Sequence, residues 1–159
     1  MCIRDSSNAF SRSWAEYKIG FSDSSGNYWI GNDRLSQLTQ SGRYKLRFDL
    51  QLRSNLSWQY AEYSSFVVSS EASNYRMEVS GYSGNIGDAL SYSNTMMFST
   101  YDRDNDPYNN YNCAASYGGG FWYKSCAYAR VNTIRSLFRW YQPGFKWHDL
   151  QTTRMWLTC

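Results

Sequence analysis

Hydrophobic and polar residues alternate most strictly in the stretch RYKLRFDLQLR, which spans residues 43–53. Apolar side chains stand at every second position, and charged residues or glutamine fill the positions between them. Because successive side chains of a strand point to opposite faces, this pattern predicts a strand with one buried face and one face in water. Two further stretches, WQYAEYSSFVV from Trp58 and YRMEV from Tyr75, are separated by the turn-rich SSEASN. They predict neighbouring strands and therefore an antiparallel sheet.

Two short helices are predicted ahead of this sheet. In SRSWAEYKIGF, Ser13 and Glu16 have the spacing of a capping box, and Gly20 is placed to end the helix. In NDRLSQLTQSG, Asn32 is the expected cap and Gly42 the expected end. The chain is thus expected to combine an antiparallel sheet with a few short helices.

The composition fits a sheet-rich fold and argues against several classes of function. Aromatic residues make up 19% of the 159 residues, and 15 of them are tyrosines, which favours strands and aromatic packing over a helical bundle. The net charge is +3, and the basic residues are scattered singly, so we expect no nucleic acid partner and no binding to a membrane surface. No run approaches the roughly 18 apolar residues of a spanning helix, so membrane insertion is not expected.

The amino terminus has an unusual origin. Its first residues, MCIRDS, match the translated end of a transposon adaptor used in sequencing libraries. We therefore expect residues 1–6 to be a non-native scar and residues 7–159 to form one domain. Secretion cannot be read from such a segment.

Regular patterning fades between Ser83 and Cys126, where Gly, Asn, Asp, Ser and Tyr dominate. A connection of this length needs an internal organiser. Cys113 and Cys126 enclose no histidine or cysteine that would complete a zinc site, which predicts a disulfide and an oxidising compartment. Cys159 is then left unpaired.

The motif DRDNDPYNNYNCA places Asp102, Asp104 and Asp106 on alternate positions of this loop. Such a group of carboxylates suits a hard cation, and Ca²⁺ in particular. An EF-hand that began at Asp102 would need Gly and Glu where Pro107 and Cys113 stand, so that motif is excluded. A simpler alternative stays open, because aspartates also cap turns.

Five segments carry a family resemblance, and they occur in the order YWIGNDRLSQLT, YKLRFDL, FSTYDRDND, NCA and GGGFWYKSC. Together they resemble the fibrinogen-like domain found in fibrinogen chains, ficolins, tachylectins, tenascins and angiopoietins, and the resemblance extends from Phe10 to Met155. It implies an α+β fold, the fibrinogen C-terminal fold, with a central antiparallel sheet, short helices and a long loop region organised by calcium. Family members begin with a further subdomain, so residues 7–159 are expected to be a partial domain.

The resemblance also implies a calcium site. Asp104 and Asp106 would bind Ca²⁺ through their side chains, and Asp102 would orient the loop. Backbone carbonyls would complete the site, from Tyr108 and from Asn110, or from Tyr111 because the loop is one residue longer than in many relatives. In the family Cys113 and Cys126 are paired, and the peptide bond before the first of them is expected to be cis.

A ligand pocket lies beside the calcium site in the family. The positions that match it are Tyr117, Phe121, Trp122, Tyr123, Ala127 and Tyr128. Aromatic walls suit an acetyl methyl group or a sugar face. For Phe121 and Trp122 the alternative is burial in the core. Ala127 replaces a histidine that many ligand-binding relatives have, and Val131, Asn132 and Thr133 replace their LNG signature.

These observations predict a secreted, calcium-dependent, lectin-like module that binds acetylated glycans on microbial or host surfaces. The alternative is a protein-interaction module of the tenascin or angiopoietin kind, which binds an extracellular protein without sugar. No catalysis is expected, because the single histidine, His148, has only the adjacent Asp149 and no placed nucleophile. Relatives oligomerise through amino-terminal segments, so the full-length protein is expected to be a homo-oligomer.

Overall fold

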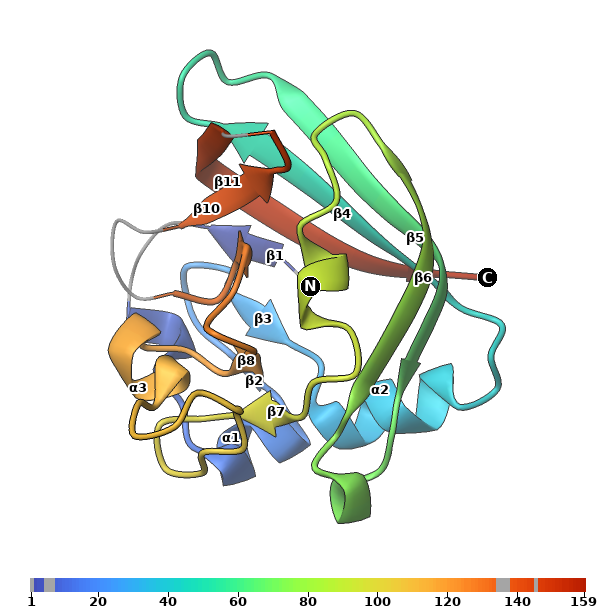
Figure 1. Ribbon diagram of the computed structural model, residues 1–159, viewed down its shortest axis with the longest axis vertical. Helices are drawn as coiled ribbons and strands as arrows, with labels where there is room; N and C mark the ends of the chain where they lie inside the picture. Colours follow the sequence, from blue (N-terminus) through green and yellow to red (C-terminus); the bar gives the residue numbers. More distant parts are fainter. Residues whose placement is uncertain (1, 5–7, 134–137, 145) are drawn as a thin grey trace.

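One curled antiparallel sheet dominates the computed structural model, which describes residues 2–4, 8–133, 138–144 and 146–159 (Figure 1). Its strands follow the order β6-β5-β4-β11-β10-β9, and β1 also pairs with β11. The strand bounds are β1 Cys2–Arg4, β4 Lys45–Leu52, β5 Trp58–Val68, β6 Met77–Gly84, β9 Ala129–Arg130, β10 Arg139–Gln142 and β11 Lys146–Thr158. The predicted α+β fold with a central antiparallel sheet is confirmed.

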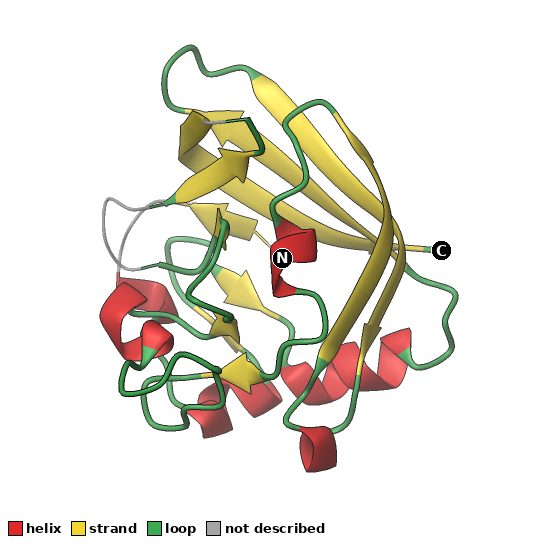
Figure 2. Cartoon of the chain, in the orientation of Figure 1, coloured by secondary structure: helices red, strands yellow, loops and turns green. Residues whose placement is uncertain are grey.

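Shorter elements gather at one end of the sheet and form the loop region (Figure 2). The elements there are α1 Trp14–Ile19, α2 Asn32–Thr39, α3 Cys113–Tyr117, the 3₁₀ helices η1 Asn8–Phe10 and η2 Glu71–Ser73, and two small two-stranded sheets, β2 Phe21–Ser22 with β3 Tyr28–Trp29 and β7 Phe98–Ser99 with β8 Phe121–Trp122. The 3₁₀ helix η3 Leu90–Ser93 lies apart from them, in front of the middle of the sheet in the view of Figure 2. The expected loop between Ser83 and Cys126 therefore contains short regular elements.

The sheet follows the alternation in the sequence closely at β4. Leu46, Phe48 and Leu50 are completely buried, and the polar residues between them lie on the other face. The strand predicted from Trp58 is confirmed as β5. The next strand starts later than predicted, at Met77, because Asn74 and Tyr75 have left-handed backbone conformations that a strand cannot accommodate.

The long strand β11 has no clear signal in the sequence. It shifts register against β4 between Leu150 and Thr152, as a β-bulge does. Leu150 is buried before the shift, whereas Thr153 and Met155 are buried after it. Because the buried positions change from even to odd numbers, the alternation that would reveal a strand is broken.

Both predicted helices form, and the first matches its prediction in detail. Ser13 and Glu16 make the reciprocal capping box, and α1 ends at Gly20. The second helix is capped at Gly31 and not at Asn32, because the Asn32 side chain accepts a hydrogen bond from the Trp29 indole N–H (3.0 Å). It also ends at Thr39, before the predicted Gly42.

An aromatic core connects the loop region to the sheet. Trp122 is fully buried, and its ring centroid lies 5.2 Å from Phe98, 6.1 Å from Phe66 and 6.3 Å from Trp29. The glycine run before it permits this packing, since a Cβ on Gly120 would stand 2.8 Å from Cε1 of Phe98.

The segment expected to be a scar is described only in part. Residues 2–4 form β1, which pairs with Thr152, Thr153 and Arg154 of β11. Met1, Asp5 and Ser6 lie outside the described residues. The non-native origin of residues 1–6 stays a prediction.

Candidate functional site

Asp102 fixes the start of the aspartate loop to the first helix. Its Oδ1 accepts hydrogen bonds from the backbone N–H of Trp14 (2.9 Å) and from the Thr100 hydroxyl (2.7 Å). The Trp14 N–H is one of the free donors at the beginning of α1, where a carboxylate is favourable. The side chain thus positions the loop, which is the role that the family resemblance implies for it.

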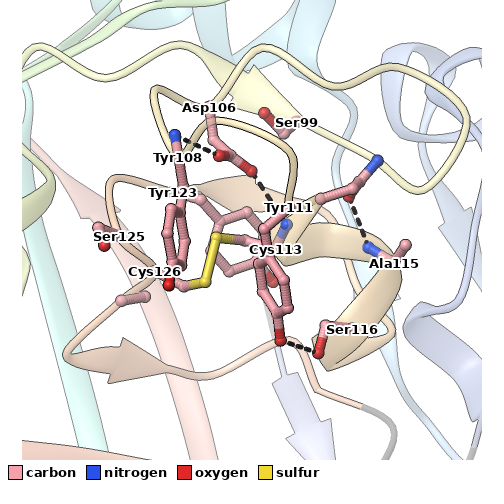
Figure 3. Close-up of a disulfide and its surroundings, with 12 residues drawn as sticks. Ser99, Asp106, Tyr108, Tyr111, Cys113, Ala115, Ser116, Tyr123, Ser125 and Cys126 are labelled. Carbon is pink, nitrogen blue, oxygen red and sulfur yellow. Dashed lines mark hydrogen bonds between the residues drawn. A yellow bond between two sulfur atoms is a disulfide. The ribbon is translucent and has the colours of Figure 1, made fainter.

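Asp104 and Asp106 lie beside each other further along the loop. Asp106 accepts hydrogen bonds from the backbone N–H groups of Tyr108 (2.9 Å) and Cys113 (3.0 Å), as Figure 3 shows. Asp104 Oδ1 accepts from the backbone N–H of Asp106 (3.2 Å). Partial burial raises the pKa of Asp106, and the neighbouring Asp104 adds to this rise. A cation between the two carboxylates would remove that repulsion.

The donor set around these carboxylates is one that calcium prefers. Asp104 and Asp106 offer hard carboxylate oxygens, and the exposed segment after them offers backbone carbonyls. Asn110 has a left-handed backbone (φ 62°), and Tyr108 O accepts from Tyr111 N–H (3.1 Å). A carbonyl oxygen has a second lone pair for a cation. Within the described residues no group of three or more His, Cys, Asp and Glu side chains could hold a metal, so backbone oxygens are needed here.

The predicted disulfide between Cys113 and Cys126 is confirmed, with a Cα–Cα distance of 5.6 Å. It ties α3 to the segment that leads into β9. The cis peptide bond is Ser125–Cys126, before the second cysteine, so its expected position before Cys113 was wrong. The N–H of Cys113 instead begins α3 and donates to Asp106. Cys159 is free and exposed, as predicted.

The six residues matched to the family's ligand pocket divide into two groups. Phe121, Trp122, Tyr123 and Ala127 are between 0% and 3% exposed, so they form the floor of this region and not its surface. Trp122 donates its indole N–H to Tyr75 O (2.7 Å), and Tyr123 donates its hydroxyl to Gly119 O (2.7 Å). Tyr117 and Tyr128 are only partly buried, and they alone of the six offer substantial surface.

A continuous row of aromatic rings extends from Tyr128. Its ring stacks on Tyr92 at 3.9 Å between centroids and lies 4.6 Å from Tyr141, which in turn lies 5.1 Å from Trp147. We refer to Tyr92, Tyr117, Tyr128, Tyr141 and Trp147 as the aromatic strip. Three of these residues, Tyr92, Tyr141 and Trp147, were not among the predicted pocket residues.

Two cations accompany the aromatic strip. The Arg130 guanidinium lies 4.4 Å from the ring centroid of Trp147 and 4.7 Å from that of Tyr117. Lys124 Nζ lies 5.0 Å from the ring centroid of Tyr92. The strip therefore offers apolar ring faces with positive charge at both ends.

His148 and Asp149 do not form a catalytic pair. His148 Nε2 lies 2.9 Å from the Gln142 side-chain oxygen, and burial lowers the pKa of the imidazole. The Asp149 carboxylate instead accepts a hydrogen bond from Arg139 (2.6 Å). An apolar groove lies elsewhere, between α2 and the end of β11, and the side chains that line it carry no charge: Tyr28, Trp29, Ile30, Leu35, Leu38, Tyr44, Met155, Trp156 and Leu157.

Residues 2–158 match the family described as fibrinogen beta and gamma chains, C-terminal globular domain. The chain belongs to this family. Tenascin from Mus musculus is 46% identical over 125 residues, which are 79% of this chain and 6% of tenascin. Fibrinogen-like protein A from Apostichopus parvimensis is 44% identical over 126 residues, or 77% of this chain and 44% of that protein. The chain thus spans less than half the length of these two relatives.

Solved structures of fibrinogen-like domains have the same fold. The fibrinogen-like globe domain of human ANGPTL2 superposes with a TM-score of 0.85 at 32% identity, covering 99% of this chain and 77% of that one. Lamprey fibrin D-dimer in complex with the peptide ligand Gly-His-Arg-Pro-amide gives a TM-score of 0.83 at 27% identity, covering 98% and 59%. These similarities confirm the fibrinogen C-terminal fold predicted from the sequence.

Proposed function

We propose that this fibrinogen C-terminal domain is a secreted, calcium-dependent recognition module that binds acetyl-bearing glycans, with no catalytic step. The observation that carries the proposal is the linkage of the aspartate loop to the aromatic strip. Asp106 accepts a hydrogen bond from the backbone N–H of Cys113, and the disulfide joins Cys113 to Cys126, which lies two residues before Tyr128. A cation at Asp106 would therefore steady the surface that contacts the ligand.

Acetylated sugars suit the chemistry of this surface. The half-exposed rings of Tyr117 and Tyr128 can pack against an acetyl methyl group or the apolar face of a sugar. Ala127, buried where many relatives have histidine, gives the floor an apolar character. The absent imidazole removes one polar contact, so hydrogen bonds to the ligand would come mainly from the backbone and the tyrosine hydroxyls.

A protein ligand is the second candidate. The structurally similar lamprey fibrin is bound to a peptide, and the loss of the histidine at Ala127 favours a departure from sugar binding. Tyrosine and arginine at a half-exposed surface are also typical of protein interfaces. This candidate would bind an extracellular protein through the same strip, without competition by acetylated sugar.

The proposed location is extracellular, and the disulfide supports it because such bonds persist in oxidising compartments. Among the described residues no helix is long and apolar enough to cross a membrane. We further propose that the full-length protein is a homo-oligomer, since several copies would turn weak single-site binding into useful avidity.

Calcium is expected to raise the melting temperature of the domain. At a concentration 100 times the Kd, binding to the folded state adds about 2.7 kcal/mol. Asp106→Asn should abolish this rise, whereas Glu78→Gln, which removes an exposed charge elsewhere, should leave it intact. Because the fold raises the pKa of Asp106, protons compete with calcium for its carboxylate. The calcium-induced increase in melting temperature should therefore become smaller as pH falls through that raised pKa. An equal rise in Asp106→Asn would contradict the site.

Retention on an N-acetylated resin tests the ligand. We expect the domain to bind in calcium and to elute with a chelator or with free N-acetylglucosamine. Tyr128→Ala should lose retention, and Tyr44→Ala, a change to a half-buried tyrosine outside the aromatic strip, should keep it. If calcium raises the melting temperature but the resin retains nothing, the acetyl ligand is wrong and the protein-interaction candidate takes its place.

A further inference from the structure

The side chain of Arg130 is fixed by three contacts within the domain. Its guanidinium packs on the rings of Trp147 (4.4 Å) and Tyr117 (4.7 Å), and its Nε donates to the carbonyl oxygen of Ala127 (3.3 Å). The side chain starts from β9 and is partly buried. Nε is the group that bonds to Ala127, and among the described residues the terminal N–H groups of Arg130 have no hydrogen-bond partner. The side chain is thus pre-ordered before any ligand arrives.

The charge of Arg130 has no partner in the part of the chain that the structure describes. Arg130 lies directly opposite Arg139 in the pairing of β9 with β10, and like charges at such positions repel. Arg139 is neutralised by Asp149 at 2.6 Å, whereas no described acidic side chain forms an ion pair with Arg130. Asp149 thus neutralises Arg139 alone, and the positive charge of Arg130 is open to a carboxylate from a ligand.

The surroundings of Arg130 indicate what would carry that carboxylate. The guanidinium presents parallel N–H donors, an arrangement that matches the two oxygens of a carboxylate. Beside it, Tyr141 and Tyr128 continue the row of ring faces, and Lys124 provides a second cation at the other end, on Tyr92. A row of flat apolar faces with a cation at each end suits a chain of sugar rings that bear acidic groups.

We propose that Arg130 is a binding site for the carboxylate of an acidic sugar, whose ring lies on the aromatic strip. The inference rests on the proposed recognition function and names a further class of ligand for the same surface. Two features favour an acidic sugar over an acidic peptide. The adjacent rings of the aromatic strip can cover the apolar faces of successive sugar rings. Lys124 and Arg130 lie apart along the strip, so they suit negative charges that repeat along one glycan.

Binding to glucuronic acid and to glucose provides a matched test, since the two sugars differ only in the carboxylate. Both are immobilised at equal density on sensor surfaces, and a third surface carries a short oligoglutamate peptide with the same density of carboxylates. We expect the domain to bind glucuronic acid more tightly than glucose or the peptide. Arg130→Gln should weaken binding to glucuronic acid about tenfold or more, because hydrogen bonds to a charged group are lost.

Two further variants separate recognition from folding. Arg130→Lys keeps the charge but loses the parallel donors, so we expect an intermediate loss with an unchanged melting temperature. Arg43→Gln removes the same charge at an exposed position whose guanidinium lies over no aromatic ring in the described part of the chain, and it should bind as the parent does. Retention of the parent domain on the N-acetylated resin separates the two failures. A parent that is retained but does not prefer glucuronic acid to glucose contradicts this inference alone, whereas a parent that is not retained contradicts the proposed function.

Three results would overturn the inference. Equal binding to glucose and glucuronic acid would show that the carboxylate is not recognised. If Arg130→Gln and Arg43→Gln lowered the affinity for glucuronic acid equally, the effect would come from the net charge of the domain and not from a site at Arg130. Tighter binding of oligoglutamate than of glucuronic acid would assign the site to an acidic protein.

Discussion

Trp122→Ala is expected to lower the free energy of unfolding by about 3–5 kcal/mol, the largest loss that we predict for a single substitution. Trp122 is fully buried between the sheet and the loop region, where it contacts Phe98 and Phe66. Its removal leaves a cavity and also frees the carbonyl oxygen of Tyr75, which accepts the indole N–H. Urea unfolding followed by circular dichroism measures the change.

Trp58→Ala provides the matched control for this prediction. Trp58 is 44% exposed and has mainly a cation–π contact with Arg154, at 5.1 Å. Its loss should cost about 0.5–1 kcal/mol. Similar losses in the two variants would mean that Trp122 does not hold the loop region on the sheet, and that the core has another centre.

Replacement of both disulfide cysteines, in the variant Cys113→Ser/Cys126→Ser, is expected to cost about 3 kcal/mol in the chain-entropy model. The bond closes a loop over a sequence separation of 13, so the unfolded chain gains freedom when it is removed. The same variant should bind calcium more weakly, because the Cys113 N–H that holds Asp106 is no longer fixed. Denaturant unfolding and calcium titration measure the two effects.

The exposed Cys159 provides a control for a cysteine-to-serine change that breaks no disulfide. Cys159→Ser should leave both stability and calcium affinity unchanged, since this cysteine is free. A reducing agent should reproduce the effect of the double variant on the parent protein. Full stability of the double variant would contradict a structural role for the bond.

The sequence predicted the elements whose signals are local. The alternation around Phe48 and the capping box at Ser13 need no information from distant residues, and both appear as expected. The strand β11 was missed because its bulge near Leu150 interrupts the alternation. The cap of α2 was misplaced by one residue because Asn32 is recruited by Trp29, a contact that a helix signature does not contain.

The site was predicted only as far as its motifs reach. The aspartate motif and the two cysteines lead to Asp106 and to the disulfide, which the structure brings together. Burial separates Trp122 from Tyr128, although both follow the glycine run, and the sequence offers no periodicity there to distinguish them. Trp147 and Tyr92 reach the aromatic strip only through the fold.

The place of β11 in the sheet has a kinetic consequence. From Leu150 to Thr158 it pairs with β4, and a hydrogen bond between Trp156 and Asp49 joins residues that are 107 positions apart. Closing so long a loop lowers the entropy of the chain before the contacts between the two strands can compensate for that loss. Proteins dominated by such distant pairings fold in milliseconds to seconds. Until β11 docks, β4 has an unpaired edge, and this interval is when self-association would compete with folding.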